Sequence, residues 1–274
     1  MTFDEIAAPA AWHCVDFISD VHLQDTEPAN FLAWRNYLEQ SPADAVFILG
    51  DLFEVWMGDD ALSSASEAYD AGRHTGLRFE QRCSRVLHFA AQQRNLYFMH
   101  GNRDFLVGQA LAGACGMQLL ADPSVLSFGG QRFLLSHGDA LCLADAEYQK
   151  FRSMVRSEAW QTQFLATPLQ ERMQQARMMR VASEARKKDL KAAGQPWIDV
   201  DAQAVVQWMD AARCRHFIHG HTHEGRDHAI SSAQGHGTRH VLPDWHVDER
   251  PVRGYALRLN LLNGAVSAQH IPVA

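Results

Sequence analysis

Cysteine is scarce in this sequence, and no two cysteines stand close together. The 274 residues include five, an odd number, spread over the whole chain. This distribution argues against a disulfide framework and offers no Cys-x-x-Cys pair for a structural zinc ion. We therefore expect reduced and mostly buried thiols, as in a cytoplasmic protein.

Long apolar runs and an excess of positive charge are also missing. No stretch reaches the ~18 apolar residues that a membrane-spanning helix needs. The first 13 residues include Asp4 and Glu5 and lack a basic or long apolar segment, so we expect no signal peptide. The net charge of −7 argues against a nucleic-acid partner. The composition, with 47% hydrophobic and 21% charged residues, is typical of a soluble globular protein.

Short apolar runs that end abruptly in polar residues recur along the chain and predict β-strands. Helical patterns lie between several of them, at 31–39 and 77–93, and this alternation predicts a layered α/β fold. Glycine-containing pairs at 129–130 and 263–264 predict hairpin turns, which makes the later half more antiparallel. The five predicted strands cover 14–19, 46–49, 96–99, 132–136 and 215–218.

The segment 145–194 interrupts this alternation, because it contains no predicted strand. Two helical runs meet at Thr167 and Pro168, which suit the N-cap and the first helical position of the second run. Gly194 is typical of a helix end. We interpret 145–194 as a helical cap inserted in a catalytic domain made of residues 1–144 and 195–274.

A polar cluster directly follows each predicted strand. In open α/β sheets, ligands bind outside the carboxyl ends of strands, so such clusters can converge on one site. Residues two apart in an extended chain point to the same side, so each Asp-x-His or His-x-His pair can hold one ion. Adjacent glycines allow a close approach of the backbone. The clusters are Asp-Val-His at 20–22, Gly-Asp at 50–51, Gly-Asn-Arg-Asp at 101–104, His-Gly-Asp at 137–139 and Gly-His-Thr-His at 220–223.

The side chains in these clusters narrow the choice of metal. Oxygen and imidazole nitrogen without thiolate suit divalent ions such as manganese or iron. Seven ligands suffice for two ions if one carboxylate bridges them, and Asp51 is the natural bridge. Two ions ~3.5–4 Å apart can activate a water for in-line displacement at phosphorus. Any one cluster alone is usually a turn, and His100 and His219 are expected to be ordinary strand-end residues. The predicted ligands are Asp20, His22, Asp51, Asn102, His137, His221 and His223.

The order of these motifs resembles the calcineurin-like metallophosphoesterase superfamily over residues 16–223. Longer strings at 50–54, 56–60, 100–106 and 137–142 resemble the UDP-2,3-diacylglucosamine diphosphatases of lipid A synthesis. The resemblance implies two mixed β-sheets flanked by helices, with the inserted helical cap. It also implies hydrolysis of UDP-2,3-diacylglucosamine to UMP and 2,3-diacylglucosamine 1-phosphate (lipid X). Two Mn²⁺ ions would be the cofactors, with Fe²⁺ or another divalent ion as alternatives. The protein would bind peripherally to the cytoplasmic side of the inner membrane.

The resemblance also assigns roles to individual residues. Asp51 would bridge one ion held with Asp20, His22 and His223 and a second ion held with Asn102, His137 and His221. Arg103 stands where many relatives have histidine, and because arginine stays charged it should clamp phosphate instead of donating a proton. The implied catalytic residues are Asp51, Asn102, Arg103 and His137. The implied substrate contacts are Asn102, Arg103, Asp145, Tyr148, Arg180, Ser183, Lys187 and His221.

The cap departs from the family pattern at Lys187 and Leu190, where asparagine and lysine are usual. Residues 171–191 contain seven basic and three acidic residues. This basic face could meet anionic lipid headgroups, and the apolar residues between could line a groove for acyl chains or form an ordinary hairpin core.

Two other functions remain open. A metallophosphoesterase acting on a soluble nucleotide would keep the metals, although the long cap counts against it. A scaffold that has lost catalysis would lack ligands, whereas all seven are present.

Overall fold

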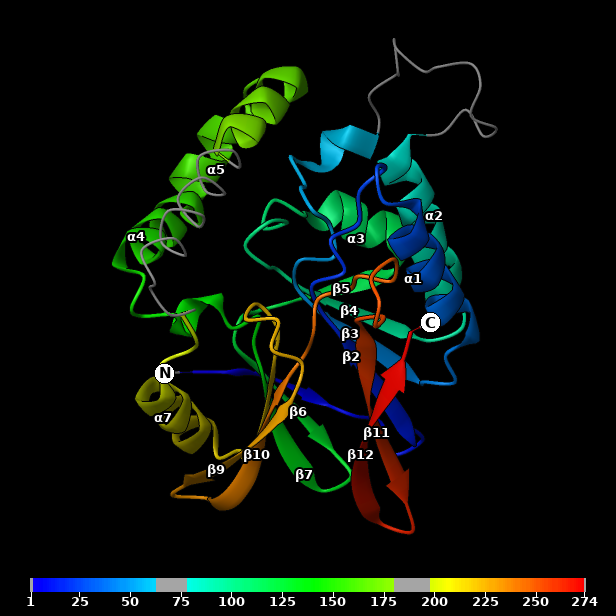
Figure 1. Cartoon of the computed structure of the whole chain (residues 1–274), viewed down its shortest axis with the longest axis vertical. Helices are drawn as coiled ribbons and strands as arrows, with labels where there is room; N and C mark the ends of the chain where they lie inside the picture. Colours follow the sequence, from blue (N-terminus) through cyan, green and yellow to red (C-terminus); the bar gives the residue numbers. More distant parts are fainter. Residues whose placement is uncertain (1, 63–77, 180–197, 274) are drawn as a thin grey trace.

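Two six-stranded β-sheets form the centre of the protein (Figure 1). The computed structural model describes residues 2–62, 78–179 and 198–273. One sheet has the strand order β12-β11-β2-β3-β4-β5, and the other has the order β1-β6-β7-β8-β10-β9. Both combine parallel and antiparallel pairs, as the family resemblance implied. The strands are β1 (Asp4–Ala7), β2 (Cys14–Ile18), β3 (Ala45–Leu49), β4 (Asn95–Met99), β5 (Met117–Leu120), β6 (Ser124–Phe128), β7 (Gln131–Leu135), β8 (His216–His219), β9 (Asp227–Ser232), β10 (Gly235–Val241), β11 (Tyr255–Leu262) and β12 (Ala265–Pro272).

Helices cover the outer face of each sheet. Alternate residues of β2, β3 and β4 point into the space between the sheets, where Phe17 and Phe47 stack with their ring centroids 5.1 Å apart. The other residues of these strands pack against α1, α2 and α3, and the second sheet packs against α7. Strands buried on both faces have mostly apolar sequences, which is why these strands could be predicted. The helices are α1 (Pro28–Gln40), α2 (Phe79–Ala91), α3 (Gln109–Cys115), α4 (Ala146–Val155), α5 (Glu158–Leu165) and α7 (Ala202–Ala212).

The two predicted hairpin turns are confirmed. Residues 129–130 connect the antiparallel strands β6 and β7, and residues 263–264 connect β11 and β12. All five predicted strands are present. Most of their ends lie one residue away from the predicted position, and the other ends coincide with it.

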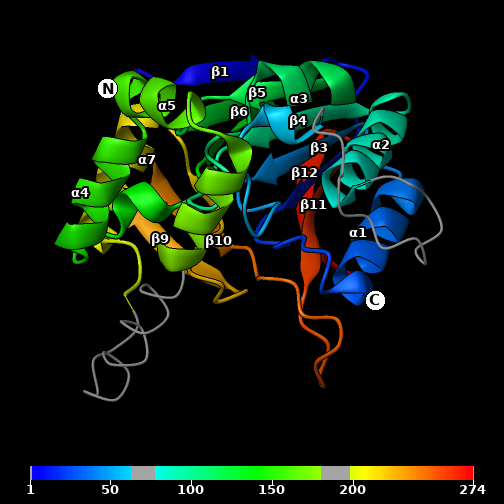
Figure 2. The same ribbon diagram turned by 90° about the horizontal axis from the view of Figure 1, so that it is seen from above.

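The described part of the predicted cap is helical. It contains α4, α5 and a further helix at 169–179, and it lies on the same side of the molecule as α7, away from α1 and α2 (Figure 2). Thr167 donates its hydroxyl to the carbonyl of Phe164 at 2.7 Å, so its side chain closes α5 instead of capping the next helix. Gly194 lies outside the described residues, and the cap boundaries stay a prediction. Across the ranges that the structure describes, no helix combines the length and apolar character that crossing a bilayer requires.

The helices of the predicted cap are tied to the rest of the protein by polar contacts. The side chain of Arg172 is 1% exposed and donates to the carbonyls of Met57 and Thr167 and to the carboxylate of Asp60. Asp139 in turn accepts hydrogen bonds from two residues of α4, the Tyr148 hydroxyl and Nε of Arg152. Both attachments fix the described cap helices relative to the strand ends that carry the predicted ligands.

Candidate metal centre

The predicted ligands all follow the carboxyl ends of strands, and the two sheets bring these ends together. Asp20 and His22 follow β2, Asp51 follows β3 and Asn102 follows β4, in one sheet. The other ligands follow β7 and β8 of the second sheet. The prediction that the clusters converge is therefore confirmed, and the centre lies where the two sheets meet. The ligands of the second sheet are His137, His221 and His223.

Most of these ligands have a left-handed backbone. The φ angles are 53° for Asp20, 52° for His22 and 51° for Asp51, and they are 65° and 60° for His221 and His223. Such angles are uncommon for residues other than glycine, and strained backbone of this kind gathers at functional sites. The premise that each two-residue pair is extended was therefore wrong, because the backbone is left-handed at both members of each pair.

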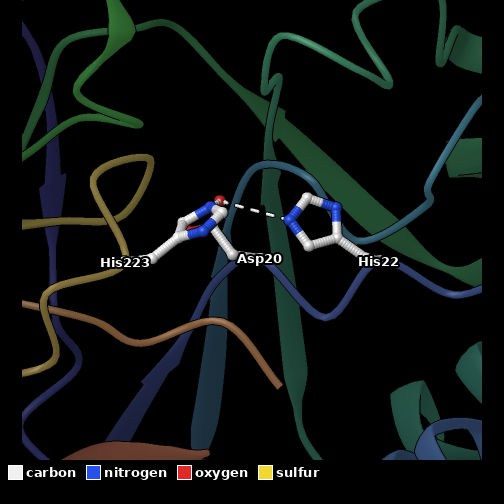
Figure 3. Close-up of side chains that lie close together, drawn as sticks. All are labelled: Asp20, His22 and His223. Carbon is white, nitrogen blue, oxygen red and sulfur yellow. Dashed lines mark hydrogen bonds and ion pairs between the residues drawn. The ribbon is translucent and has the colours of Figure 1, made fainter. Parts of the chain in front are cut away.

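Asp20, His22 and His223 form one compact group (Figure 3). Nε2 of His223 lies 3.1 Å from Oδ1 of Asp20, and Nε2 of His22 lies 3.8 Å from the same oxygen. The other oxygen of Asp20 accepts hydrogen bonds from the Ser19 hydroxyl at 2.5 Å and the His221 backbone at 2.9 Å. One face of the carboxylate is thus fixed by the protein, and the other is turned toward the two histidines.

Asp20, Asp51 and His137 form a second compact group. Oδ1 of Asp51 lies 3.8 Å from Nε2 of His137. Oδ1 of Asn102 lies 3.0 Å from the same nitrogen and 2.8 Å from Nδ1 of His221. Among the described residues, Asp20 is common to both compact groups, and the bridging role of Asp51 stays a prediction.

The electrostatics of the centre favour added positive charge. Burial raises the pKa of Asp20, but the neighbouring His223, His137 and His22 outweigh it and hold this pKa well below its usual range. Burial lowers the pKa of His137, but Asp51 and Asp20 raise it overall to about 9. Divalent ions can replace protons in such a cluster, because metal ligands must give up their protons on binding.

The donor atoms fit divalent cations. Nε2 of His22 is buried and has no hydrogen-bond partner among the described residues, as expected of a nitrogen reserved for a metal. Oxygen and nitrogen donors gather here, and neither compact group includes a thiol. The arrangement therefore suits hard to borderline ions.

Two carboxylates that the sequence did not single out support the histidine ligands. Oδ2 of Asp244 lies 3.1 Å from Nδ1 of His223, and Oε2 of Glu54 lies 3.2 Å from Nδ1 of His22. Carboxylates in this position fix the ring orientation of metal-binding histidines and raise their basicity. Glu54 stands in a motif string, which could have drawn attention to it. Asp244 follows no motif and lies next to His223 only through the fold.

A third carboxylate organises the ligand loops. Asp104 is fully buried and accepts backbone hydrogen bonds from Gly101 at 2.9 Å, Asp51 at 3.2 Å and Leu52 at 2.8 Å. Burial and the nearby Asp51 raise the pKa of Asp104 to about 7. Asp104 therefore links the loops after β3 and β4 without being a member of either compact group.

Arg103 lies directly beside Asp51. Its backbone N–H donates to Oδ1 of Asp51 at 2.9 Å, and its Nε lies 3.6 Å from Oδ2. Its guanidinium also donates to the carboxylate of Glu54. A fixed cation next to the predicted bridging ligand is well placed to meet a phosphate.

The glycines beside the ligands are required by space. A Cβ atom on Gly101 would lie 2.0 Å from Oδ1 of Asp51, and one on Gly220 would lie 2.2 Å from Oδ2 of Asp20. The close approach predicted for these glycines is confirmed.

The structure places the predicted cap contacts unequally. The Tyr148 ring stacks on His221 with ring centroids 6.0 Å apart, and its hydroxyl donates to Asp139 at 2.5 Å. Asp145 accepts the backbone N–H of Tyr148 at 3.0 Å and so caps α4. Nε of Arg152 donates to Asp139 at 2.9 Å. The predicted contacts Arg180, Ser183 and Lys187 lie outside the described residues.

Comparison with known proteins agrees with this centre. The model of the calcineurin-like phosphoesterase family matches residues 15–225. UDP-2,3-diacylglucosamine hydrolase of Xanthomonas campestris pv. campestris is 40% identical over 236 residues, which cover 84% of this chain and 90% of the relative. The protein of the same name from Chromohalobacter salexigens is 39% identical over 245 residues, or 88% of this chain and 91% of the relative. Since the family model spans all the predicted ligands, the chain belongs to the calcineurin-like phosphoesterase family.

Proposed function

We propose that the protein hydrolyses the diphosphate bond of UDP-2,3-diacylglucosamine to UMP and 2,3-diacylglucosamine 1-phosphate. The observation that carries this proposal is the complete set of oxygen and nitrogen ligands gathered at the strand ends. The relatives that carry the name of this activity cover most of the chain. A soluble nucleotide substrate would leave the cap without a role.

We propose that the centre binds two divalent ions, both manganese. One ion would be held by Asp20, His22, Asp51 and His223, and the other by Asp51, Asn102, His137 and His221. When bound, such ions activate a water and stabilise the attacking and leaving oxygens at phosphorus. Asp20, common to the two compact groups, supports the close pairing of these sites.

The protein's own side chains position the substrate around the ions. Arg103 clamps the phosphate that carries the developing charge, and because it stays protonated it does not deliver a proton. Its contacts to Asp51 and Glu54 fix it before the substrate arrives. The attacked phosphorus is the one that remains in UMP.

The cap binds the diacylated sugar and rests on the cytoplasmic face of the inner membrane. Met154, Leu165 and Met178 expose 49%, 42% and 66% of their surface. Met173 is instead partly buried and packs against the main core. Exposed apolar side chains on helices near the site are suited to acyl chains.

An activity assay on UDP-2,3-diacylglucosamine tests the proposal. Chelation should abolish turnover, and stepwise addition of manganese should restore it. Hydrolysis in ¹⁸O-labelled water should place the label in UMP, and label in the sugar phosphate would refute the choice of phosphorus. Faster hydrolysis of a dinucleoside polyphosphate would favour the soluble-nucleotide alternative. Sedimentation with anionic lipid vesicles tests the membrane contact separately.

A further inference from the structure

A groove of about 540 Å³ opens beside the metal centre. Its walls come from the segment 249–255, from the end of β12 and from the residues around His223. His223 also forms a compact group with Asp20 and His22, so the groove reaches the metal centre. We call it the C-terminal groove.

The cap approaches the other end of the ligand set. Tyr148 of α4 stacks on His221, and Arg156 of the same region donates to the carbonyl of Gly101 at 2.8 Å. None of the described residues of α4 and α5 lines the C-terminal groove. Figures 1 and 2 both show the orange connection between β10 and β11 apart from these helices. The two halves of a diphosphate substrate can therefore leave the centre in different directions.

The C-terminal groove has the size and surface of a nucleotide site. Its volume falls within the ~300–1,000 Å³ that small-molecule sites occupy. Tyr255 and His270 line it and stack on each other, with ring centroids 4.1 Å apart. Val252, with 39% of its surface exposed, adds an apolar patch to the same wall. Flat aromatic surfaces are the kind on which nucleobases stack.

The charges in the groove favour a polar occupant over an acyl chain. Glu249 can accept hydrogen bonds from ribose hydroxyls, and Arg250 adds a cation to the same loop. Nε of Arg253 lies 3.1 Å from Asp244, the carboxylate that also contacts His223. An acyl chain in this place would remove these charges from water without replacing their contacts.

We propose that the C-terminal groove binds the UMP half of the substrate, with uracil and ribose between the 249–255 segment and β12 and the phosphate toward His223. This proposal rests on the proposed function and adds to it a subsite for the nucleoside. The lipid half then lies toward α4 and the nucleoside half toward β11 and β12.

Photo-crosslinking with 5-iodo-UMP locates the base directly. The full chain, loaded with manganese, is irradiated with this probe, and the modified peptide is identified by mass spectrometry. We expect modification within 249–255 or at His270, and unlabelled UMP should prevent it. Modification within 146–179 instead would overturn the proposal.

Binding measurements on surface variants give an independent test. By calorimetry, Arg250→Glu and Val252→Glu should each raise the Kd of UMP at least about tenfold. Leu262→Glu, at a 70% exposed position in the same pair of strands, is the matched control and should bind UMP like the wild type. Inorganic phosphate should bind all of these proteins alike, because it needs only the metal centre.

The possible outcomes distinguish a failure of the proposed UMP groove from a failure of the proposed hydrolysis. Unchanged UMP affinity in both groove variants would overturn the proposal, as would equal losses for UMP and phosphate, which would place the defect at the metal centre. A wild-type protein that gives the expected crosslink but leaves UDP-2,3-diacylglucosamine intact would support the groove and refute the proposed function alone.

Discussion

Oε2 of Glu54 lies 3.2 Å from Nδ1 of His22. The other oxygen of the same carboxylate accepts a hydrogen bond from the guanidinium of Arg103. One side chain, only 6% exposed, thus links a predicted metal ligand to the predicted phosphate clamp. Glu54 is therefore in contact with both groups.

Replacing Glu54 by alanine should weaken metal binding and catalysis together. Loss of such a supporting carboxylate typically costs about 10–100-fold in metal affinity or activity. Glu54→Gln should retain part of both, because the amide can still accept from Arg103. Titration of chelated protein with manganese and the rate at saturating metal would measure the two effects. Glu39→Gln, at a position exposed to solvent, is the control, and a Glu54→Ala variant with wild-type values would contradict the role.

Replacing Asp51 by alanine should abolish turnover more completely than replacing His22. A bridging carboxylate touches both ions, whereas His22 touches one. Residual rates of Asp51→Ala and His22→Ala at saturating manganese provide the comparison, with metal content measured by mass spectrometry. If Asp51→Ala kept more than about a few per cent of the wild-type rate, Asp20 would be the better bridging residue.

The sequence predicted the central strands and the ligands, because both leave local signals. The strands β2, β3 and β4 are buried on both faces and are mostly apolar, with the ion-paired Asp16 as a buried exception in β2. The predicted ligands could be recognised because residues of metal-binding types directly follow a predicted strand. The edge strand β9 was not predicted, because its side chains are all half-buried or exposed and few apolar residues mark it.

Other features of the site depend on the fold and left no local signal. Asp244 lies in the connection between β10 and β11, far from His223 in the sequence, and the two residues are in contact only in the folded protein. The left-handed backbone at Asp20 and Asp51 is imposed by surrounding contacts, and neither residue type reveals it in a sequence.

Removing the positive charge of Arg103 should slow the reaction without removing the metals. Arg103 contacts Asp51 but is not a predicted ligand, so its loss should leave the metal content unchanged. Loss of a charge-stabilising donor of this kind costs about 10²–10³ in kcat. Arg103→Lys should recover little, because the forked geometry is lost. A variant that loses manganese along with activity would show that Arg103 maintains the centre instead.

Replacing Gly220 by alanine should disturb the ion held with Asp20. The added Cβ would lie 2.0 Å from the Ser19 hydroxyl oxygen and 2.2 Å from the Asp20 carboxylate, so the loop must shift. We expect lower manganese affinity in a folded protein. Gly113→Ala, where no atom lies within 4 Å of the added Cβ and the backbone is helical, controls for the general effect of a glycine substitution. Equal manganese affinity in both variants would mean that the loop can shift without weakening metal binding.

Polar substitution of the exposed cap methionines should lower activity on the diacylated substrate alone. Met178 and Met179 are 66% and 46% exposed, whereas Met173 packs against the core. If acyl chains cover the exposed pair, changing both to glutamine removes apolar contacts far from the phosphorus and should lower kcat/KM about tenfold. Hydrolysis of a small generic phosphodiester should be unaffected.

The matched variant Met173→Gln distinguishes lipid contact from folding. Because Met173 is partly buried and packs against the core, its change should lower the thermal midpoint and reduce both activities together. The exposed pair should leave the midpoint near the wild-type value. A deacylated UDP-glucosamine that wild-type protein hydrolyses as fast as the diacylated form would show that the cap does not read the lipid. In that case, the exposed methionines would not bind the acyl chains of the substrate.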